Sequence, residues 1–151
     1  MMKLRIPPIV LLACSGMLSW WLAERLPSFD FTWWFGKGFG LALIGAGGIM
    51  LAISVAAFIR AKTTVNPTDP AQTKALVTSG LYQISRNPMY LGMAAVLLGI
   101  ALLLANFAAF SGPVFFVWIV TLLQIKPEET ALQKVFGEDY QSYRLRVRRW
   151  I

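Results

Sequence analysis

The sequence predicts an all-α integral membrane protein with four transmembrane helices plus short amphipathic C-terminal helices, in a single domain covering residues 1–151. The first observation behind this prediction is composition: 57% of the residues are hydrophobic and only 14% are charged, which is too apolar for an ordinary soluble domain. The second is the arrangement of the apolar residues in long runs between polar, basic segments. The predicted spans cover about residues 6–26, 38–59, 89–106 and 110–125.

The first span, residues 6–26, is long enough to cross a hydrocarbon core of about 30 Å at about 1.5 Å per residue. The stretch "LLAC", which ends at Cys14, is also similar to a lipoprotein processing site, and a secretory signal begins in the same way. We favour a transmembrane helix because Pro7 and Pro8 interrupt the short run before Cys14 and the sequence stays apolar after it.

The second span, residues 38–59, is rich in glycine, and Gly36 and Gly40 have the GxxxG spacing. A glycine-rich segment can form a phosphate-binding loop. In an apolar helix, however, small residues usually permit close packing of a neighbouring helix. The sequence therefore predicts helix packing at these glycines.

The third and fourth spans, residues 89–106 and 110–125, form one nearly uncharged stretch that "NFAAFSGP" interrupts at residues 106–113. Turn residues at this point favour a hairpin of two tilted helices. Before the hairpin, residues 60–88 are polar and contain several prolines, and we expect them to form the main loop outside the membrane.

The C-terminal tail, residues 126–151, is too polar to cross the membrane. Two apolar stripes at helical spacing predict two short amphipathic helices against the membrane face, with Gly137 ending the first. The first stripe is Leu132, Val135 and Phe136, and the second is Tyr140, Tyr143 and Val147. The arginines near the end of the tail are expected to meet anionic lipid headgroups.

Basic residues predict the orientation. In the four-helix arrangement, twelve of the fourteen lysines and arginines fall on one side, and only Arg25 and Lys37 lie opposite. By the positive-inside rule, both termini and the loop at residues 60–88 face the cytoplasm. The compact chain with minimal loops suggests a bacterial inner membrane. The net charge of +7 is thus explained by membrane orientation, and we expect no nucleic-acid partner.

Missing residue types exclude several chemistries. The chain has no histidine, so it lacks the commonest general base and every serine–histidine or cysteine–histidine nucleophile pair. Cys14 is the single cysteine, which excludes an intrachain disulfide and a thiolate metal cluster. We therefore expect no metal site, and any reaction must use carboxylates, arginines, tyrosines, amides or a bound cofactor.

Unusual polar residues flank the predicted hairpin at its cytoplasmic end. Tyr82, Arg86, Asn87 and Tyr90 precede or begin the third span, and Glu128 and Glu129 follow the fourth. Taken singly, each has a structural explanation: orientation anchor, interfacial aromatic, helix start or first-turn acid. A hairpin makes the two groups neighbours, so a ligand site between them is the functional alternative.

Two stretches together resemble the isoprenylcysteine carboxyl methyltransferase family and, more broadly, the membrane phospholipid methyltransferases. They are "LVTSGLYQISRNPMYLG" at residues 76–92 and "PEETALQKVFGEDYQSYRLRVRRW" at residues 127–150. The resemblance implies a small helical membrane bundle that binds S-adenosylmethionine in a cytoplasm-facing pocket closed by the C-terminal segment. The resemblance therefore implies that the chain is an S-adenosylmethionine-dependent methyltransferase.

The resemblance also implies site residues. Cofactor contacts fall on Lys74, Ala75, Leu76, Val77, Tyr82, Asn87, Pro88, Met89, Tyr90 and Glu128. We take Arg86 and Glu129 as the catalytic candidates. The sequence departs from the family pattern at two positions: Asn87 stands where histidine is frequent, and Gln124 lies near the place of an arginine that eukaryotic members use for substrate.

The residue types suit the parts of S-adenosylmethionine without reference to a family. Glu128 or Glu129 can meet its ammonium or ribose hydroxyls, Arg86 its carboxylate, and aromatic faces its sulfonium. Methyl transfer depends mainly on alignment in a dry pocket and requires no metal. Without histidine, a carboxylate or thiolate acceptor is favoured over an ammonium group, which must first lose a proton to Glu129 or a tyrosine.

We therefore predict an isoprenylcysteine carboxyl O-methyltransferase-like enzyme whose lipophilic or lipid-modified acceptor enters laterally from the bilayer, with membrane lipids as further partners. Phospholipid N-methylation, or S- or O-methylation of another small acceptor, is the alternative reaction. A non-catalytic membrane module that kept the fold is a rival of another class, supported by Asn87 and Gln124. A third hypothesis is an adaptor that docks on anionic lipid or acidic partners through the arginines of residues 144–149.

Overall fold

The computed structural model describes residues 6–33, 36–61 and 75–151. Within these ranges the chain is helical and contains no strand, apart from one isolated bridge between Asp30 and Asn106. This confirms the all-α prediction. The elements in order are α1 (Pro8–Arg25), η1 (Pro27–Phe29), α2 (Gly36–Arg60), η3 (Gly80–Gln83), α3 (Pro88–Leu104), η4 (Phe107–Phe110), α4 (Ser111–Val120), the π-helical η5 (Thr121–Ile125) and α5 (Lys126–Arg146).

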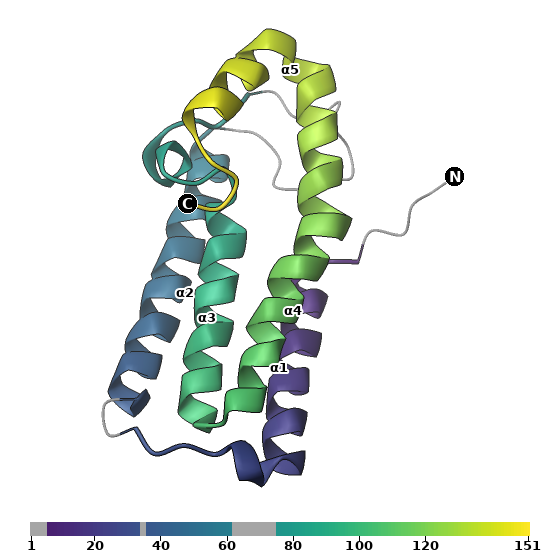
Figure 1. Ribbon diagram of the computed structural model, residues 1–151. Helices are drawn as coiled ribbons and strands as arrows, with labels where there is room; N and C mark the ends of the chain where they lie inside the picture. The colour runs from purple at the N-terminus through teal and green to yellow at the C-terminus, as the bar shows by residue number, and fades with distance from the viewer. Residues whose placement is uncertain (1–5, 34–35, 62–74) are drawn as a thin grey trace.

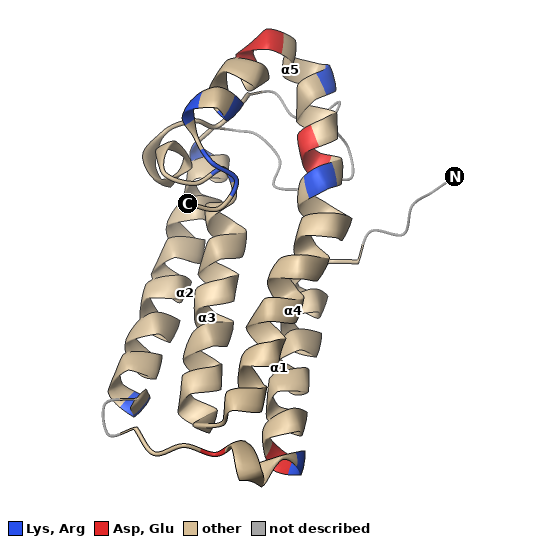
Figure 2. Ribbon diagram, in the orientation of Figure 1, with Lys and Arg blue, Asp and Glu red and all other residues tan. Residues whose placement is uncertain are grey.

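Helices α1 to α4 lie side by side as a bundle, and α5 rises beyond one end before bending back (Figure 1). Helix α3 packs against α2, α4 and α1, and α4 also packs against α1. Charged residues lie towards the two ends of the bundle, and the middle of each helix carries almost none (Figure 2). Large apolar side chains such as Met17, Ile49 and Val114 point outwards and are 63–69% exposed, as expected for a surface that faces lipid.

Among the described residues, α2 and the continuous helical stretch Phe107–Arg146 are long and apolar enough to cross a membrane, and α3 is a shorter apolar helix. Helix α1 ends in Glu24 and Arg25 and is not in this group. The four-span arrangement therefore stays a prediction, although the four helices that it needs are present.

Glycines bring α2 and α3 unusually close together. A Cβ atom on Gly47 would lie 2.5 Å from the carbonyl oxygen of Gly92, and one on Gly99 would lie 2.5 Å from that of Gly40. The prediction of close helix packing is thus confirmed, with Gly40 and Gly47, seven residues apart, as the contact positions. Gly36 instead lies against Trp33.

The hairpin turn between α3 and α4 lies where the sequence predicts it. Ala105 adopts a left-handed conformation, with φ of 49°, and Asn106 follows it with its side chain fully buried. The Asn106 Nδ2 atom donates to the carbonyl oxygen of Leu26 at 2.8 Å and to Asp30 Oδ1 at 2.6 Å. One amide therefore ties this turn to the connection after α1.

The tail differs from its prediction at its start. We predicted a fourth span at about residues 110–125 and separate short helices in the tail, but α4 continues through η5 into α5, and Ile125 has helical φ and ψ of −62° and −50°. Pro127 explains the π-helical segment, because its ring crowds the carbonyl four residues earlier and it donates no hydrogen bond. Glu128 and Glu129 are consequently not at a free helix N-terminus.

Gly137 divides α5 into two halves, as predicted, with φ of 49° and ψ of −117°. Beyond it the chain reverses, and Tyr140, Tyr143 and Val147 are buried against Leu76, Leu132 and Phe136. The two predicted apolar stripes of the tail thus pack against each other. Val135 of the first stripe is the exception, because it is 44% exposed. This reversal returns the C-terminus to the start of α3.

Candidate active site

A cavity of about 490 Å³ lies where α5 folds over the end of the bundle. Its walls come from the start of α1, the end of α2, residues 75–90, and the η5–α5 region. One part is charged, with Arg86, Glu128 and Glu129. The other part is apolar. The lining residues are Ile6, Pro7, Pro8, Ile9, Phe58, Ala75, Leu76, Val77, Tyr82, Arg86, Asn87, Met89, Tyr90, Met93, Gln124, Glu128, Glu129, Leu132, Tyr140 and Tyr143.

The structure brings almost all the predicted site residues to this cavity. Those that line it are Ala75, Leu76, Val77, Tyr82, Arg86, Asn87, Met89, Tyr90, Glu128 and Glu129. Pro88 does not line it, because its ring is fully buried in the first turn of α3. Lys74 lies outside the described residues. The roles of these residues remain predictions, but their proximity is a property of the fold.

Tyr90 and Glu128 join the two predicted groups directly. The Tyr90 hydroxyl donates to Glu128 Oε1 at 2.7 Å, which connects α3 to α5 across 38 residues of sequence. A hydrogen bond to a carboxylate is stronger than one between neutral groups, and it fixes the orientation of the carboxylate. The two groups of polar residues are therefore neighbours, as the hairpin predicted.

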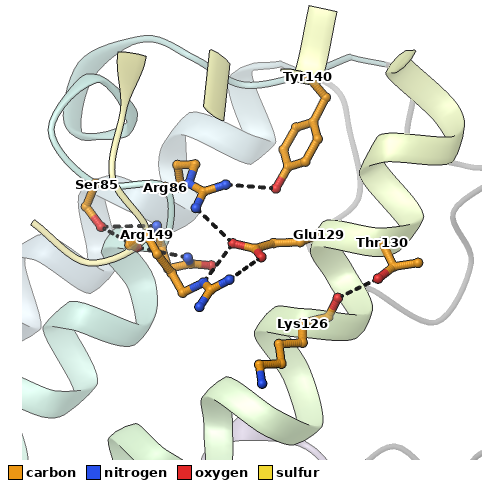
Figure 3. Close-up of polar contacts among 8 residues, drawn as sticks. Ser85, Arg86, Lys126, Glu129, Thr130, Tyr140 and Arg149 are labelled. Carbon is orange, nitrogen blue, oxygen red and sulfur yellow. Dashed lines mark hydrogen bonds and ion pairs between the residues drawn. The ribbon is translucent and has the colours of Figure 1, made fainter. Parts of the chain in front are cut away.

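Glu129 lies between two arginines (Figure 3). Arg149 donates from Nε to Oε1 at 2.9 Å and from Nη2 to Oε2 at 2.7 Å, and Arg86 Nη2 lies 3.1 Å from Oε1. Burial by itself raises the pKa of the Glu129 carboxyl, but the Arg149 hydrogen bonds and the charges of Arg86, Arg149 and Arg144 outweigh it and lower the pKa below its ordinary value. Glu129 is thus ionised and held by both arginines.

Residues 35–139 match the model of the phospholipid methyltransferase family, which is more than two thirds of the chain. The chain belongs to this family. The match includes the predicted loop, the hairpin and the first half of α5, and so covers the candidate site residues from Lys74 to Glu129.

Relatives of this family member include named methyltransferases. It is 31% identical to protein-S-isoprenylcysteine O-methyltransferase B of Arabidopsis thaliana over 121 residues, 80% of this chain and 61% of that protein. It is 36% identical to the Schizosaccharomyces pombe protein-S-isoprenylcysteine O-methyltransferase over 72 residues, 48% of this chain and 30% of the other. The resemblance drawn from the sequence motifs is confirmed.

A shorter relative from Haemophilus influenzae, whose name states no function, is 40% identical over 63 residues, 42% of this chain and all of that protein. No solved structure matches the chain significantly. This chain thus spans 61% of the length of the Arabidopsis protein and 30% of the length of the Schizosaccharomyces pombe protein.

In this phospholipid methyltransferase family member, Arg86 makes several contacts at once. Its Nη1 donates to the Tyr140 hydroxyl at 3.5 Å, and its backbone amide donates to the carbonyl oxygen of Arg148 at 3.0 Å. Its side chain is only 10% exposed, and among the described residues its Nε atom has no hydrogen-bond partner. A buried N–H without a partner costs free energy, so Arg86 has a donor available for an anionic ligand.

The C-terminal residues contact two of the predicted site residues, Asn87 and Glu129. The resemblance implied a pocket closed by the C-terminal segment, but these individual contacts were not predicted. The carbonyl oxygen of Arg149 accepts from Asn87 Nδ2 at 3.0 Å and from Ser85 Oγ at 3.4 Å. Trp150 packs on the hydrophobic core that includes Tyr90. The donor group of Asn87 is therefore used to hold the chain end, whereas we expected it at the cofactor. No local sequence feature separates Arg149 from its neighbouring arginines.

Tyr82 and Tyr143 hold the loop under α5. The Tyr143 hydroxyl donates to the carbonyl oxygen of Tyr82 at 2.6 Å, and the Tyr82 ring meets Phe58 of α2 edge to face. Burial raises the pKa of Tyr143 to about 12 and also raises the pKa of Tyr82. Both tyrosines are thus neutral at physiological pH and poorly suited to accept a proton.

Gln124 is the polar group at the apolar part of the cavity. It lies in the π-helical segment, is 2% exposed, and donates through Nε2 to the carbonyl oxygen of Ile6. π-Helical turns place side chains that a regular helix would direct elsewhere. Gln124 therefore connects the start of α1 to the site wall.

Proposed function

We propose that this membrane methyltransferase family member is an S-adenosylmethionine-dependent methyltransferase of the isoprenylcysteine carboxyl O-methyltransferase type, acting on a lipophilic acceptor. One observation carries the proposal: the lining of a single cavity combines charged side chains, those of Arg86, Glu128 and Glu129, with apolar ones that include residues 6–9 and Met93. The volume of about 490 Å³ is in the range of small-molecule sites. In the proposed topology, four helices span the membrane and the cavity faces the cytoplasm.

The charged part suits the polar groups of S-adenosylmethionine. The Glu128 carboxylate would hold the ammonium or the ribose hydroxyls, with Tyr90 fixing its orientation. Arg86, whose Nε atom lacks a partner among the described residues, would hold the carboxylate. When bound, the cofactor supplies a methyl group activated on a sulfonium.

Glu129 has a positioning role in this proposal. Its carboxylate is occupied by Arg86 and Arg149, and its lowered pKa makes it a weak base. It keeps Arg86 in place and fastens the C-terminal residues over the cavity. An acceptor that is already nucleophilic when ionised, such as a carboxylate or thiolate, needs no base here.

The apolar part suits the hydrocarbon portion of the acceptor. Ile6 and Ile9, at the start of α1, line the cavity and are also exposed at the surface of the bundle, so this wall is shared with the lipid-facing side. A lipophilic acceptor would enter laterally there. The names of the Arabidopsis and yeast relatives favour a prenylated cysteine carboxylate as its reacting group.

The test is methyl transfer by the purified protein in lipid nanodiscs, with labelled S-adenosylmethionine and two acceptors. One acceptor is an N-acetylated S-prenylcysteine, and the other is phosphatidylethanolamine. Formation of a base-labile methyl ester on the first supports the proposal. N-methylation of the second alone would replace it with the alternative that the family description suggests. Cofactor binding without any transfer would favour the non-catalytic module.

A further inference from the structure

A second cavity, of about 420 Å³, lies beside the first one. It is formed by the last turns of α2, from Ile53 to Arg60, by Ala61 directly after the helix, and by residues 76–82. Leu76, Val77 and Tyr82 line both cavities and therefore separate them. The charged residues that line the first cavity, Arg86, Glu128 and Glu129, do not line the second one.

The lining of the second cavity is basic and hydroxyl-bearing. Arg60 is its cation, and Thr78 and Ser79 are its hydroxyl side chains, whereas the hydroxyl of Ser54 donates to the carbonyl oxygen of Met50. Among the residues described as lining it, none is acidic, and the described ion pairs do not involve Arg60. Arginine and hydroxyl donors together are the groups that proteins use to bind phosphate oxygens. The polar half of the cavity therefore favours a phosphate group.

The other half of the cavity is apolar and continues onto the outer face of α2. Ile53 and Ala57 line it, and Ile53 is 50% exposed. Ile49, one helical turn earlier, is 63% exposed on the same helix, which is long and apolar enough to cross a membrane. A ligand held by Arg60 through a phosphate can thus extend a hydrocarbon chain along α2 into the bilayer.

We propose that this second cavity binds the phosphate group of an anionic phospholipid, with Arg60 as the main contact and the acyl chain along Ile53 and Ile49. A single arginine at the end of a span also serves as an orientation anchor. Arg60 differs from a simple anchor because it lines a cavity whose other wall carries the hydroxyl groups of Thr78 and Ser79. This arrangement favours a defined binding site. This proposal does not depend on the methyltransferase reaction.

Short-chain phosphatidylglycerol and phosphatidylcholine, titrated into the detergent-purified protein by calorimetry, test the site. Wild type is expected to bind phosphatidylglycerol saturably at one site and more tightly than phosphatidylcholine. Arg60→Gln should weaken binding by roughly tenfold, because a charged hydrogen bond is lost, and Arg60→Lys should weaken it less. Arg146→Gln removes an exposed arginine outside the cavity and should leave binding unchanged.

Ala57→Leu keeps the charge and fills part of the cavity, so it should also weaken binding. Inorganic phosphate is titrated in parallel: if it displaces the lipid, the site recognises phosphate itself, and if it does not, the acyl chain is required. Absence of saturable binding in wild type would overturn the proposal. Equal weakening by Arg60→Gln and Arg146→Gln would also overturn it, because general surface charge would then explain the binding.

Discussion

Arg149, two residues from the C-terminus, holds both carboxylate oxygens of Glu129, with its Nη2 atom 2.7 Å from Oε2. Arg86 contacts the same carboxylate at 3.1 Å from the other side. Three segments that are far apart in the sequence therefore meet at one ion-pair cluster at the wall of the cavity (Figure 3). The C-terminal residues are part of the site because of this cluster.

The Glu129 cluster predicts loss of stability in acid. The pKa of Glu129 is lowered in the folded protein, so its contribution is present above its ordinary pKa of about 4.3 and is lost as the pH falls through the lower folded value. The melting temperature of wild type in detergent should fall below about pH 4.3. Glu129→Gln should melt lower at neutral pH and show a weaker fall in this window. Parallel curves for the two proteins would contradict the assignment.

The Tyr90–Glu128 hydrogen bond predicts energetic coupling between α3 and α5. Tyr90→Phe should lower the free energy of unfolding by about 1.5 kcal/mol, the typical contribution of a hydrogen bond to a charged group. In a Glu128→Leu background the same substitution should have a much smaller effect. Denaturant unfolding of the four proteins forms a double-mutant cycle. A coupling energy near zero would show that the two side chains do not interact in solution.

The glycine contacts between α2 and α3 predict a sharp difference between neighbouring glycines. Gly47→Ala should destabilise the bundle by about 1–3 kcal/mol, because its new methyl group meets the backbone of α3. Gly48→Ala is the matched control: nothing lies within 4 Å of its Cβ position, so it should be neutral or slightly stabilising. Thermal unfolding in detergent compares them, and equal effects would place the α2–α3 contact elsewhere.

Asn106 predicts a second sensitive point at the opposite end of the bundle. Asn106→Ala removes donors to Leu26 and Asp30 and should lower the free energy of unfolding by about 1–3 kcal/mol. Phe107→Ala, at the adjacent residue that is 63% exposed, is the control. If Asn106→Ala unfolds with the same midpoint as wild type, the buried amide does not hold the turn.

Much of this arrangement was predictable from local sequence. Apolar runs predicted α1 to α4, the interruption at residues 106–113 predicted the turn, and the hairpin predicted that Tyr90 and Glu128 would be neighbours. Gly137 was recognised as a break because a positive φ is easily adopted only by glycine. These features depend on residue type and spacing alone.

The continuous helix across Pro127 and the role of Arg149 were not predictable. Proline usually marks a helix start, and the π-helical segment that accommodates it carries Ile125, which is buried in the core with Leu11 and Met93. Arg149 reaches Glu129 only because the chain reverses at Gly137, and the angle of that reversal is a tertiary property. Before the fold is known, an arginine that binds lipid and one that closes a site look the same.

The central claim is that the cavity under α5 binds S-adenosylmethionine through Glu128. Calorimetric titration of the detergent-purified protein with S-adenosylmethionine and S-adenosylhomocysteine tests it most directly. Wild type should bind both saturably, Glu128→Ala should lose binding while its melting temperature shows a folded bundle, and Glu138→Ala, at an exposed glutamate of α5, should bind as wild type does. Full affinity in folded Glu128→Ala, or no binding by folded wild type, would contradict the claim.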